Sequence, residues 1–192
     1  PAEIARIGMR KPLIVTDPGV RAAGLLDKVE AVLAGQAFAV FDQVSSNPTE
    51  ASVLAGVEVA RSQGCDSLIA VGGGSAIDCA KGVAIAAAHA GPLTQYATIE
   101  GGSPRITDAV LPLIAIPTTS GTGSEVARGA ILIVQDGRKL GFHSWHLVPR
   151  SAICDPALTL GLPPALTAAT GMDAIAHCIE TFLAPAFNPA AD

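Results

Sequence analysis

The sequence predicts an α/β fold: a Rossmann-like parallel sheet with helices on both faces, followed by the start of an all-helical C-terminal domain. Short, continuously apolar runs alternate with longer Ala-rich amphipathic stretches, which is typical of buried parallel strands joined by helical crossovers. Three apolar runs end in loops of small or polar residues, at 16–17, 71–75 and 117–125. Ligands of parallel sheets bind at the carboxyl ends of the strands, so the three loops predict one shared binding edge.

The first two strands are expected at residues 13–16 and 37–41, which are short β-rich runs. Between them, residues 20–34 carry leucine and valine at helical spacing and predict a helix. After the second strand, Asn47 or Thr49 can cap a helix that runs to residue 63.

A third strand at 67–71 runs into three glycines and a serine, after which a helix is expected over 76–90. The fourth strand, 110–116, stops at a proline. Two further apolar runs, 130–134 and 139–142, flank Gln-Asp-Gly-Arg, and Asp-Gly between such runs predicts a β-hairpin.

The last part of the chain has a short strand at 152–154 and a helix at 165–184, which Gly171 should weaken. The rigid Leu-Pro-Pro connector before this helix predicts a domain boundary near Pro163. We therefore expect an α/β domain over 1–162 and the beginning of a helical domain over 163–192.

Composition excludes several classes of protein. With 12 basic and 17 acidic residues among 192, the formal net charge is −5, so a nucleic-acid-binding surface is not expected. The longest apolar runs, 83–90 and 109–117, are shorter than the ~18 residues that a membrane span needs. No signal peptide is recognised at the start, and the four cysteines lack CxxC spacing, which fits small buried thiols in a reducing cytoplasm.

The loop at 72–75 is a candidate phosphate site, because glycines let an anion approach the backbone at the start of a helix. It is not a Walker A loop, because no Gly-Lys-Ser/Thr follows at the required spacing, and it is not GxGxxG, because Ile77 stands where the third glycine is required. A plain tight turn is the alternative. The loop at 117–125 holds five hydroxyls and two glycines; a ligand loop is favoured over a linker by its place after a strand. Asp78 and Lys81, one turn apart, are interpreted from spacing alone as an exposed ion pair.

Asp173 and His177 stand four residues apart on an expected helix, hence on one face, and an oxygen and a nitrogen at this spacing suit Fe, Zn, Mn or Ni. Glu180 is a further candidate one turn on. Spacing alone favours the alternative, a pair that merely stabilises the helix, because two ligands do not complete a site. Structural roles are expected for other His and Cys side chains: His143 and His146 beside Trp145, His89 at a helix end, and Cys79 and Cys178 as buried residues.

Several segments, in this order, resemble the iron-containing (group III) alcohol dehydrogenases. They are Asn47-Pro-Thr, Gly72-Gly-Gly-Ser-Ala-Ile-Asp-Cys-Ala-Lys, Pro117-Thr-Thr-Ser-Gly-Thr-Gly-Ser-Glu, Asp155-Pro and Thr167-Ala-Ala-Thr-Gly-Met-Asp-Ala-Ile-Ala-His. The resemblance covers the chain from Lys11 onward. It implies a dinucleotide-binding domain, a helical domain and an active site in the cleft between them.

The resemblance also implies individual roles. Asp17 would bind the adenosine ribose and repel a 2′-phosphate, which favours NAD over NADP. Asp173 and His177 would be the first two of four metal ligands for one Fe²⁺ or Zn²⁺. The other implied cofactor-binding residues are Asn47, Gly73, Gly74, Ser75, Asp78, Thr118, Thr119, Thr122, Lys139 and Leu158.

This chain departs from the family at two points. Gly129 stands where many members carry a cofactor-contacting Asn, and the family's two remaining metal ligands, both histidines, lie beyond the residues given. Members are about twice as long and begin with a strand pair that is largely missing before Lys11. The chain is therefore interpreted as part of a larger enzyme.

The implied function is metal-dependent, NAD(P)-linked hydride transfer between a small alcohol or hydroxy acid and its aldehyde or ketone, in a cytoplasmic homodimer or higher homo-oligomer. The metal would hold the substrate oxygen; no catalytic acid or base can be assigned. One alternative is a metal-independent reductase of the maleylacetate type. Another is that residues 1–192 alone form a non-catalytic NAD-binding or oligomerisation module.

Overall fold

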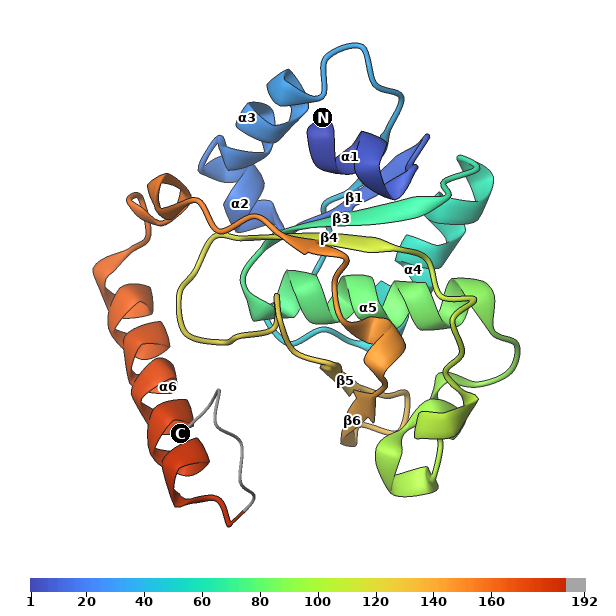
Figure 1. The fold of residues 1–192 in the computed structure, drawn as a ribbon, viewed down its shortest axis with the longest axis vertical. Helices are drawn as coiled ribbons and strands as arrows, with labels where there is room; N and C mark the ends of the chain where they lie inside the picture. Colours follow the sequence, from blue (N-terminus) through green and yellow to red (C-terminus); the bar gives the residue numbers. More distant parts are fainter. Residues whose placement is uncertain (186–192) are drawn as a thin grey trace.

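A computed structural model describes residues 1–185. Its centre is a parallel sheet in the order β2-β1-β3-β4-β7, as the alternating apolar runs predict. Figure 1 labels its three central strands, β1, β3 and β4. All residues of β1 and β3 are buried, as expected for strands covered on both faces. The strands are β1 (Pro12–Val15), β2 (Ala39–Phe41), β3 (Ser67–Gly72), β4 (Leu113–Pro117) and β7 (Ser151–Ala152).

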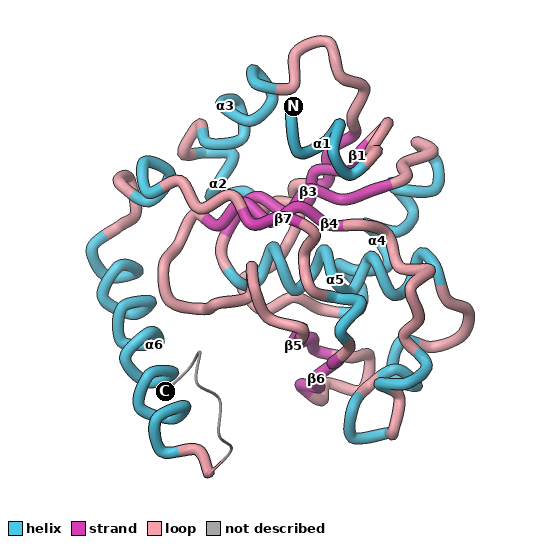
Figure 2. The backbone as a smooth tube through the Cα atoms, viewed as in Figure 1, coloured by secondary structure: helices cyan, strands magenta, loops and turns pink. Residues whose placement is uncertain are grey.

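Helices cover both faces of the sheet (Figure 2), and each face has its own apolar core. One core packs β1, β3 and β4 against α4 (Glu50–Ser62) and α5 (Gly74–Ala88). The opposite core packs the alternate residues of these strands against α1 (Ala2–Ile7), α2 (Pro18–Ala22) and α3 (Leu25–Val32). This division follows from the period-2 geometry of strands, which sends successive side chains to opposite faces.

A second, two-stranded antiparallel sheet consists of β5 (Gly129–Ile133) and β6 (Lys139–His143), as the Asp-Gly signal predicts. After β7, the chain leads into α6 (Pro164–Leu183), which is continuous through Gly171 and lies beside the rest of the fold (Figure 1). Among residues 1–185, no helix combines the length and apolar character needed to cross a membrane. Short 3-10 helices fill the connections: η1 (Leu93–Tyr96), η2 (Thr98–Glu100), η3 (Ser103–Arg105), η4 (Trp145–Leu147) and η5 (Pro156–Thr159).

Three differences from the expectations are larger than a shift of one or two residues at the end of an element. The predicted helix over 20–34 is two helices, because Gly24 between α2 and α3 adopts a left-handed φ of 68°. The predicted strand at 110–116 begins only at Leu113, and Val110 lies buried in the preceding loop. A helix, α1, precedes Lys11, where no element was expected.

Candidate functional site

The glycine loop joins β3 to α5 and requires glycine at its first position. Gly72 has a φ of 152°, and a Cβ there would lie 2.7 Å from the Cβ of Ala76. Gly73 is the N-cap of α5 and its carbonyl accepts hydrogen bonds from the N–H groups of Ala76 and Ile77. The 15-residue helix α5 therefore begins directly at the loop, which is the arrangement that receives anions in nucleotide-binding folds.

The threonine-rich loop after β4 lies against the glycine loop. Thr118 is buried, and its N–H donates to the Gly72 carbonyl. A Cβ on Gly73 would come within 3.1 Å of Thr119 Oγ1, and one on Gly74 within 3.0 Å of Thr122 Cγ2. Both glycines therefore permit a close approach of the two loops, and the candidate residues of both loops form one cluster.

Asp17 reaches this cluster from the end of β1. It caps α2, accepting a hydrogen bond from the Val20 N–H to Oδ1 at 3.0 Å. Its Oδ2 lies 3.2 Å from where a Gly72 Cβ would be. The loops after β1, β3 and β4 thus meet at adjacent strand ends, as expected, and the second carboxylate oxygen of Asp17 faces the glycine loop.

The Asn47 segment adjoins the same loop from the side of α4. Ser75 Oγ donates to the Ser46 carbonyl at 2.6 Å, and Lys139 Nζ lies 3.4 Å from Asn47 Oδ1. Asn47 and Lys139 are both exposed, so a bound molecule can reach the polar groups of this contact. Of the two predicted caps of α4, Thr49 is the one that binds the helix N-terminus.

The expectation that Asp78 and Lys81 form an exposed ion pair is wrong. Lys81 has no exposed surface, and its Nζ donates to three backbone carbonyls between residues 124 and 129, from the end of the threonine-rich loop to the start of β5. Asp78 Oδ2 accepts the Ile131 N–H at 2.9 Å, while Oδ1 is buried and has no hydrogen-bond partner among residues 1–185. Burial raises the pKa of Asp78, against the opposing effects of the Ile131 N–H and of Lys81. Helical spacing alone could not reveal that a loop 40 or more residues later covers both side chains.

Leu158 is half-buried in η5 and packs on the core that includes α2 and α3. It therefore lies on the same sheet face as the helix that Asp17 caps.

The predicted metal pair lies on α6, next to the threonine-rich loop. Asp173 Oδ2 and His177 Nδ1 are 3.7 Å apart, and both side chains are about half exposed. The helix touches the loop at Gly121, whose added Cβ would lie 2.1 Å from the Thr170 carbonyl oxygen; the Gly121 carbonyl lies 3.3 Å from His177 Nδ1. Metal-binding histidines commonly donate their second ring N–H to such a carbonyl, so the donor set and its surroundings fit two ligands of a divalent ion.

No further metal ligand joins Asp173 and His177 among the described residues. Within residues 1–185, no group of three or more His, Cys, Asp and Glu side chains could hold a metal ion, so Glu180 does not join the pair.

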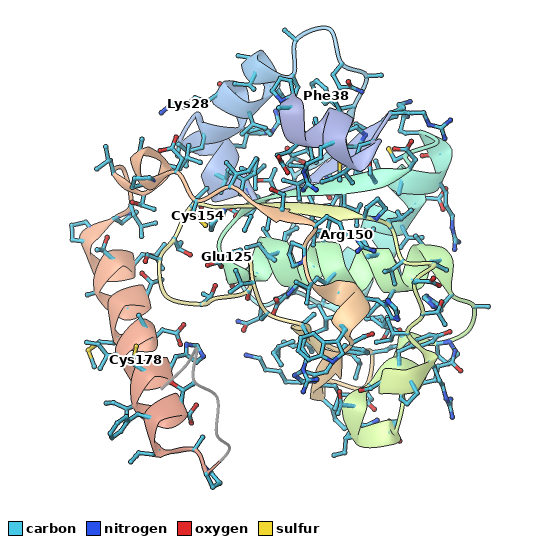
Figure 3. All side chains as sticks on the ribbon, in the orientation of Figure 1. Lys28, Phe38, Glu125, Arg150, Cys154 and Cys178 are labelled. Carbon is cyan, nitrogen blue, oxygen red and sulfur yellow. The ribbon has the colours of Figure 1, made fainter. Side chains whose placement is uncertain are left out.

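The thiols are free, and Cys79 is buried as expected, but Cys154 and Cys178 are exposed (Figure 3), contrary to the expectation of buried thiols.

The remaining histidines have structural surroundings. His143 Nδ1 hydrogen bonds with Thr98 Oγ1 at 2.8 Å, whereas His146 is exposed on η4. His89 is the C-cap of α5 and contacts the Ile85 carbonyl at the helix end. The contacts of His143 and His89 agree with the structural roles expected for them, whereas the structural role of His146 stays a prediction.

Comparisons with known proteins give relatives over the whole chain. It is 69% identical to a 4-hydroxybutyrate dehydrogenase of Cupriavidus necator, covering 100% of this chain and 50% of the relative. It is 44% identical to a 1,3-propanediol dehydrogenase of Klebsiella pneumoniae, over 97% of this chain and 48% of the relative. The chain therefore spans about half the length of these curated relatives.

Solved structures agree with the fold. A 1,3-propanediol oxidoreductase matches 100% of this chain and 50% of its own with a TM-score of 0.93 at 42% identity. A sulfoacetaldehyde reductase from Bifidobacterium kashiwanohense, in complex with NAD⁺, has a TM-score of 0.89 at 33% identity, over 98% of this chain and 50% of its own. The family model described as iron-containing alcohol dehydrogenase matches residues 1–156. Fold, sequence and the order of the loops agree, and the chain belongs to the iron-containing alcohol dehydrogenase family.

Proposed function

We propose that the whole protein is a metal-dependent, NAD-linked dehydrogenase acting on a small primary or secondary alcohol or hydroxy acid. The observation that carries the proposal is the contact at Gly121, where the loop that covers the glycine turn also touches the helix bearing Asp173 and His177. A cofactor in the first site and a metal at the second would thus be held by the two sides of one loop. Short diols and hydroxy acids are the substrate class suggested by the names of the relatives.

The residues divide the work of cofactor binding. Gly73, Gly74 and Ser75 would receive the pyrophosphate at the start of α5, and Thr118, Thr119 and Thr122 would line the cleft beside it. Asp17 would accept from the adenosine ribose hydroxyls, and its charge disfavours a 2′-phosphate, hence NAD over NADP. Asn47, Asp78, Lys139 and Leu158 complete the proposed contacts.

Asp173 and His177 would supply one oxygen and one nitrogen ligand to Fe²⁺ or Zn²⁺. Such an ion, when bound, polarises an alcohol oxygen as a Lewis acid. The chain's own residues hold the ion and the dinucleotide in place for hydride transfer, which is the cofactor's chemistry.

We further propose a division into an α/β domain over 1–162 and a helical domain from 163, of which residues 186–192 lie outside the described part. We also propose that the whole protein is a cytoplasmic homodimer or larger homo-oligomer.

The test is metal content and NAD⁺ binding of the full-length protein, with NADH formation measured across a panel of short alcohols, diols and hydroxy acids. We expect about one metal ion per chain and metal-dependent NADH formation. Asp173→Asn and His177→Ala should each lower metal affinity at least ~10-fold, whereas His146→Ala, which removes an exposed histidine on η4, should not. NAD⁺ binding with turnover but without metal would favour a metal-independent reductase, and NAD⁺ binding without turnover a non-catalytic module; both would contradict the proposal.

A further inference from the structure

Lys81 is a fully buried lysine to which the proposed function assigns no role. Its side chain on α5 has 0% exposed surface and is among the largest fully buried side chains in the described part of the chain. Lysine is almost never buried without a partner, because removing its charge from water is unfavourable unless hydrogen bonds replace the water. The hydrogen-bond partners of this ammonium group therefore indicate why a lysine is buried at this position.

All three N–H groups of Lys81 are used, and all three acceptors lie between residue 124, in the connection after β4, and residue 129, the first residue of β5. The Nζ atom lies 2.8 Å from the Ser124 carbonyl oxygen, 2.7 Å from that of Ala127 and 2.7 Å from that of Gly129. Burial lowers the pKa of Lys81 to about 8, while the carboxylates of Asp78 and Glu125 act in the opposite direction. The group is therefore charged at pH 7 and has one N–H for each carbonyl.

Charged and titratable groups surround this contact on several sides. Asp78 is on the same helix, and Glu125 belongs to the loop itself (Figure 3). His146 and Arg150 line a small cavity together with Lys81. Asp78 also accepts the Ile131 N–H, so two side chains one turn apart on α5 hold the backbone between residues 124 and 131.

The segment that Lys81 holds continues directly from the threonines of the cofactor cleft. Between β4 and β5 the chain has no helix or strand, and within the turn at 123–127 the N–H groups of Val126 and Ala127 donate to the Gly123 carbonyl. Thr119 and Thr122, just before this turn, lie on the glycine loop at the start of the helix that carries Lys81. The ammonium group thus holds residues 124–129 against α5, the same helix whose N-terminal glycines contact Thr119 and Thr122.

We propose that Lys81 is a positioning residue for cofactor binding: by fixing the backbone of residues 124–129, it presents the preceding threonine side chains over the glycine loop before the dinucleotide arrives. The inference rests on the proposed function for its cofactor. The holding of the loop can be measured without any cofactor.

The test uses full-length protein and the apolar variant Lys81→Met, which keeps most of the side-chain volume and removes the donors. Two controls are matched to it. Lys11→Met removes an ammonium group that donates to the Gln63 carbonyl away from the loop. Asp66→Asn removes a carboxylate that accepts the Lys11 N–H at the opposite end of the sheet, and we expect it to lower stability there. Hydrogen exchange of the loop amides is followed without cofactor, and the NAD⁺ dissociation constant is then measured by calorimetry.

We expect the amides of residues 118–131 to exchange at least ~10-fold faster in Lys81→Met alone, and NAD⁺ to bind about tenfold more weakly. KM for NAD⁺ should rise more than kcat falls at saturating NAD⁺. Asp66→Asn should change neither loop exchange nor NAD⁺ affinity, which separates positioning from a general loss of stability. Unchanged exchange, or faster exchange with unaltered NAD⁺ affinity, would overturn the inference.

The wild-type protein provides a second measurement, in case Lys81→Met fails to fold. Its loop amides at Val126, Ala127 and Ile131 should already be protected without cofactor, with NAD⁺ adding less than about tenfold further protection. Exchange at unstructured rates until NAD⁺ is added would contradict prior positioning. If the wild type binds no NAD⁺, the proposed function fails, while the exchange data still decide whether Lys81 holds the loop.

Discussion

Lys139 Nζ lies 3.4 Å from Asn47 Oδ1, although the two residues are 92 positions apart in the sequence. The contact joins the β-hairpin to the segment before α4, and Ser75 binds that same segment through the Ser46 carbonyl. An exposed ammonium group is thereby held at the border of the glycine loop. A cation at this place supports binding of an anionic cofactor.

Lys139→Met should therefore weaken NAD⁺ binding by about tenfold, equivalent to ~1.4 kcal/mol, with little change in thermal stability because the residue is exposed. Calorimetry at two salt concentrations measures the effect, which should shrink at high salt. Lys28→Met, at an exposed lysine of α3 (Figure 3), is the matched control and should bind NAD⁺ normally. Equal affinities for both variants would remove Lys139 from the proposed site.

Gly74→Ala should disturb the contact between the two loops. The added methyl group would lie 3.0 Å from Thr122 Cγ2 and 3.2 Å from its Oγ1, so the threonine must move by a few tenths of an ångström. We expect NAD⁺ affinity to fall by about tenfold or more while the free energy of unfolding drops by only ~1 kcal/mol, as typical for mild overpacking. Gly161→Ala is the control, since a Cβ there meets no atom of residues 1–185 within 4 Å. A Gly74→Ala protein with wild-type NAD⁺ affinity would argue against a close cofactor approach at this turn.

Asp17→Asn should change the choice of cofactor. The amide oxygen can still accept the Val20 N–H that caps α2, so the helix is retained, but the negative charge that disfavours a 2′-phosphate is removed. The ratio of NADP⁺ to NAD⁺ affinity should rise by about tenfold or more, a difference of ~1.4 kcal/mol. Dissociation constants for both cofactors measure it, with Asp27→Asn on α3 as the control. An unchanged ratio would show that Asp17 does not set the preference.

The sequence could predict the edge of the sheet where the candidate site lies, because continuous apolar strands of a parallel sheet place the loops that follow them together. The meeting of Asp17, Gly72 and Thr118 follows from that geometry. The break at Gly24 was present in the sequence as a glycine inside the helical pattern, but leucine and valine periodicity outweighed it.

The role of Lys81 could not be predicted in the same way. Helical spacing indicates which residues of α5 share a face, but not what packs on that face. The segment that covers Lys81 is the connection after β4, and its path depends on tertiary contacts such as those of Gly73 with Thr119. For the same reason, the spacing of Asp173 and His177 predicts a pair, whereas its neighbour Gly121 is revealed only by the fold.

Asp66 gives a test of the fold that is independent of any ligand. Its carboxylate accepts the backbone N–H groups of Arg10 and Lys11, the Ser67 hydroxyl and the Arg10 side chain, and so ties the start of β3 to the chain before β1. Partial burial would raise the pKa of Asp66, but the hydrogen bonds outweigh it and lower the pKa from the usual 3.8 to about 2.

The carboxylate is thus more acidic in the folded state than in the unfolded chain. Its contribution is fully present above pH ~4 and is lost as the pH falls toward 2, because the unfolded chain takes up the proton first. Asp66→Asn should lower the free energy of unfolding by about 1–2 kcal/mol at pH 7, with the difference shrinking toward zero near pH 2. Urea unfolding at pH 7, 4 and 2.5 measures it, and Glu58→Gln, exposed on α4, is the control. A deficit that stays constant down to pH 2.5 would mean that the hydrogen-bonded carboxylate is not its source.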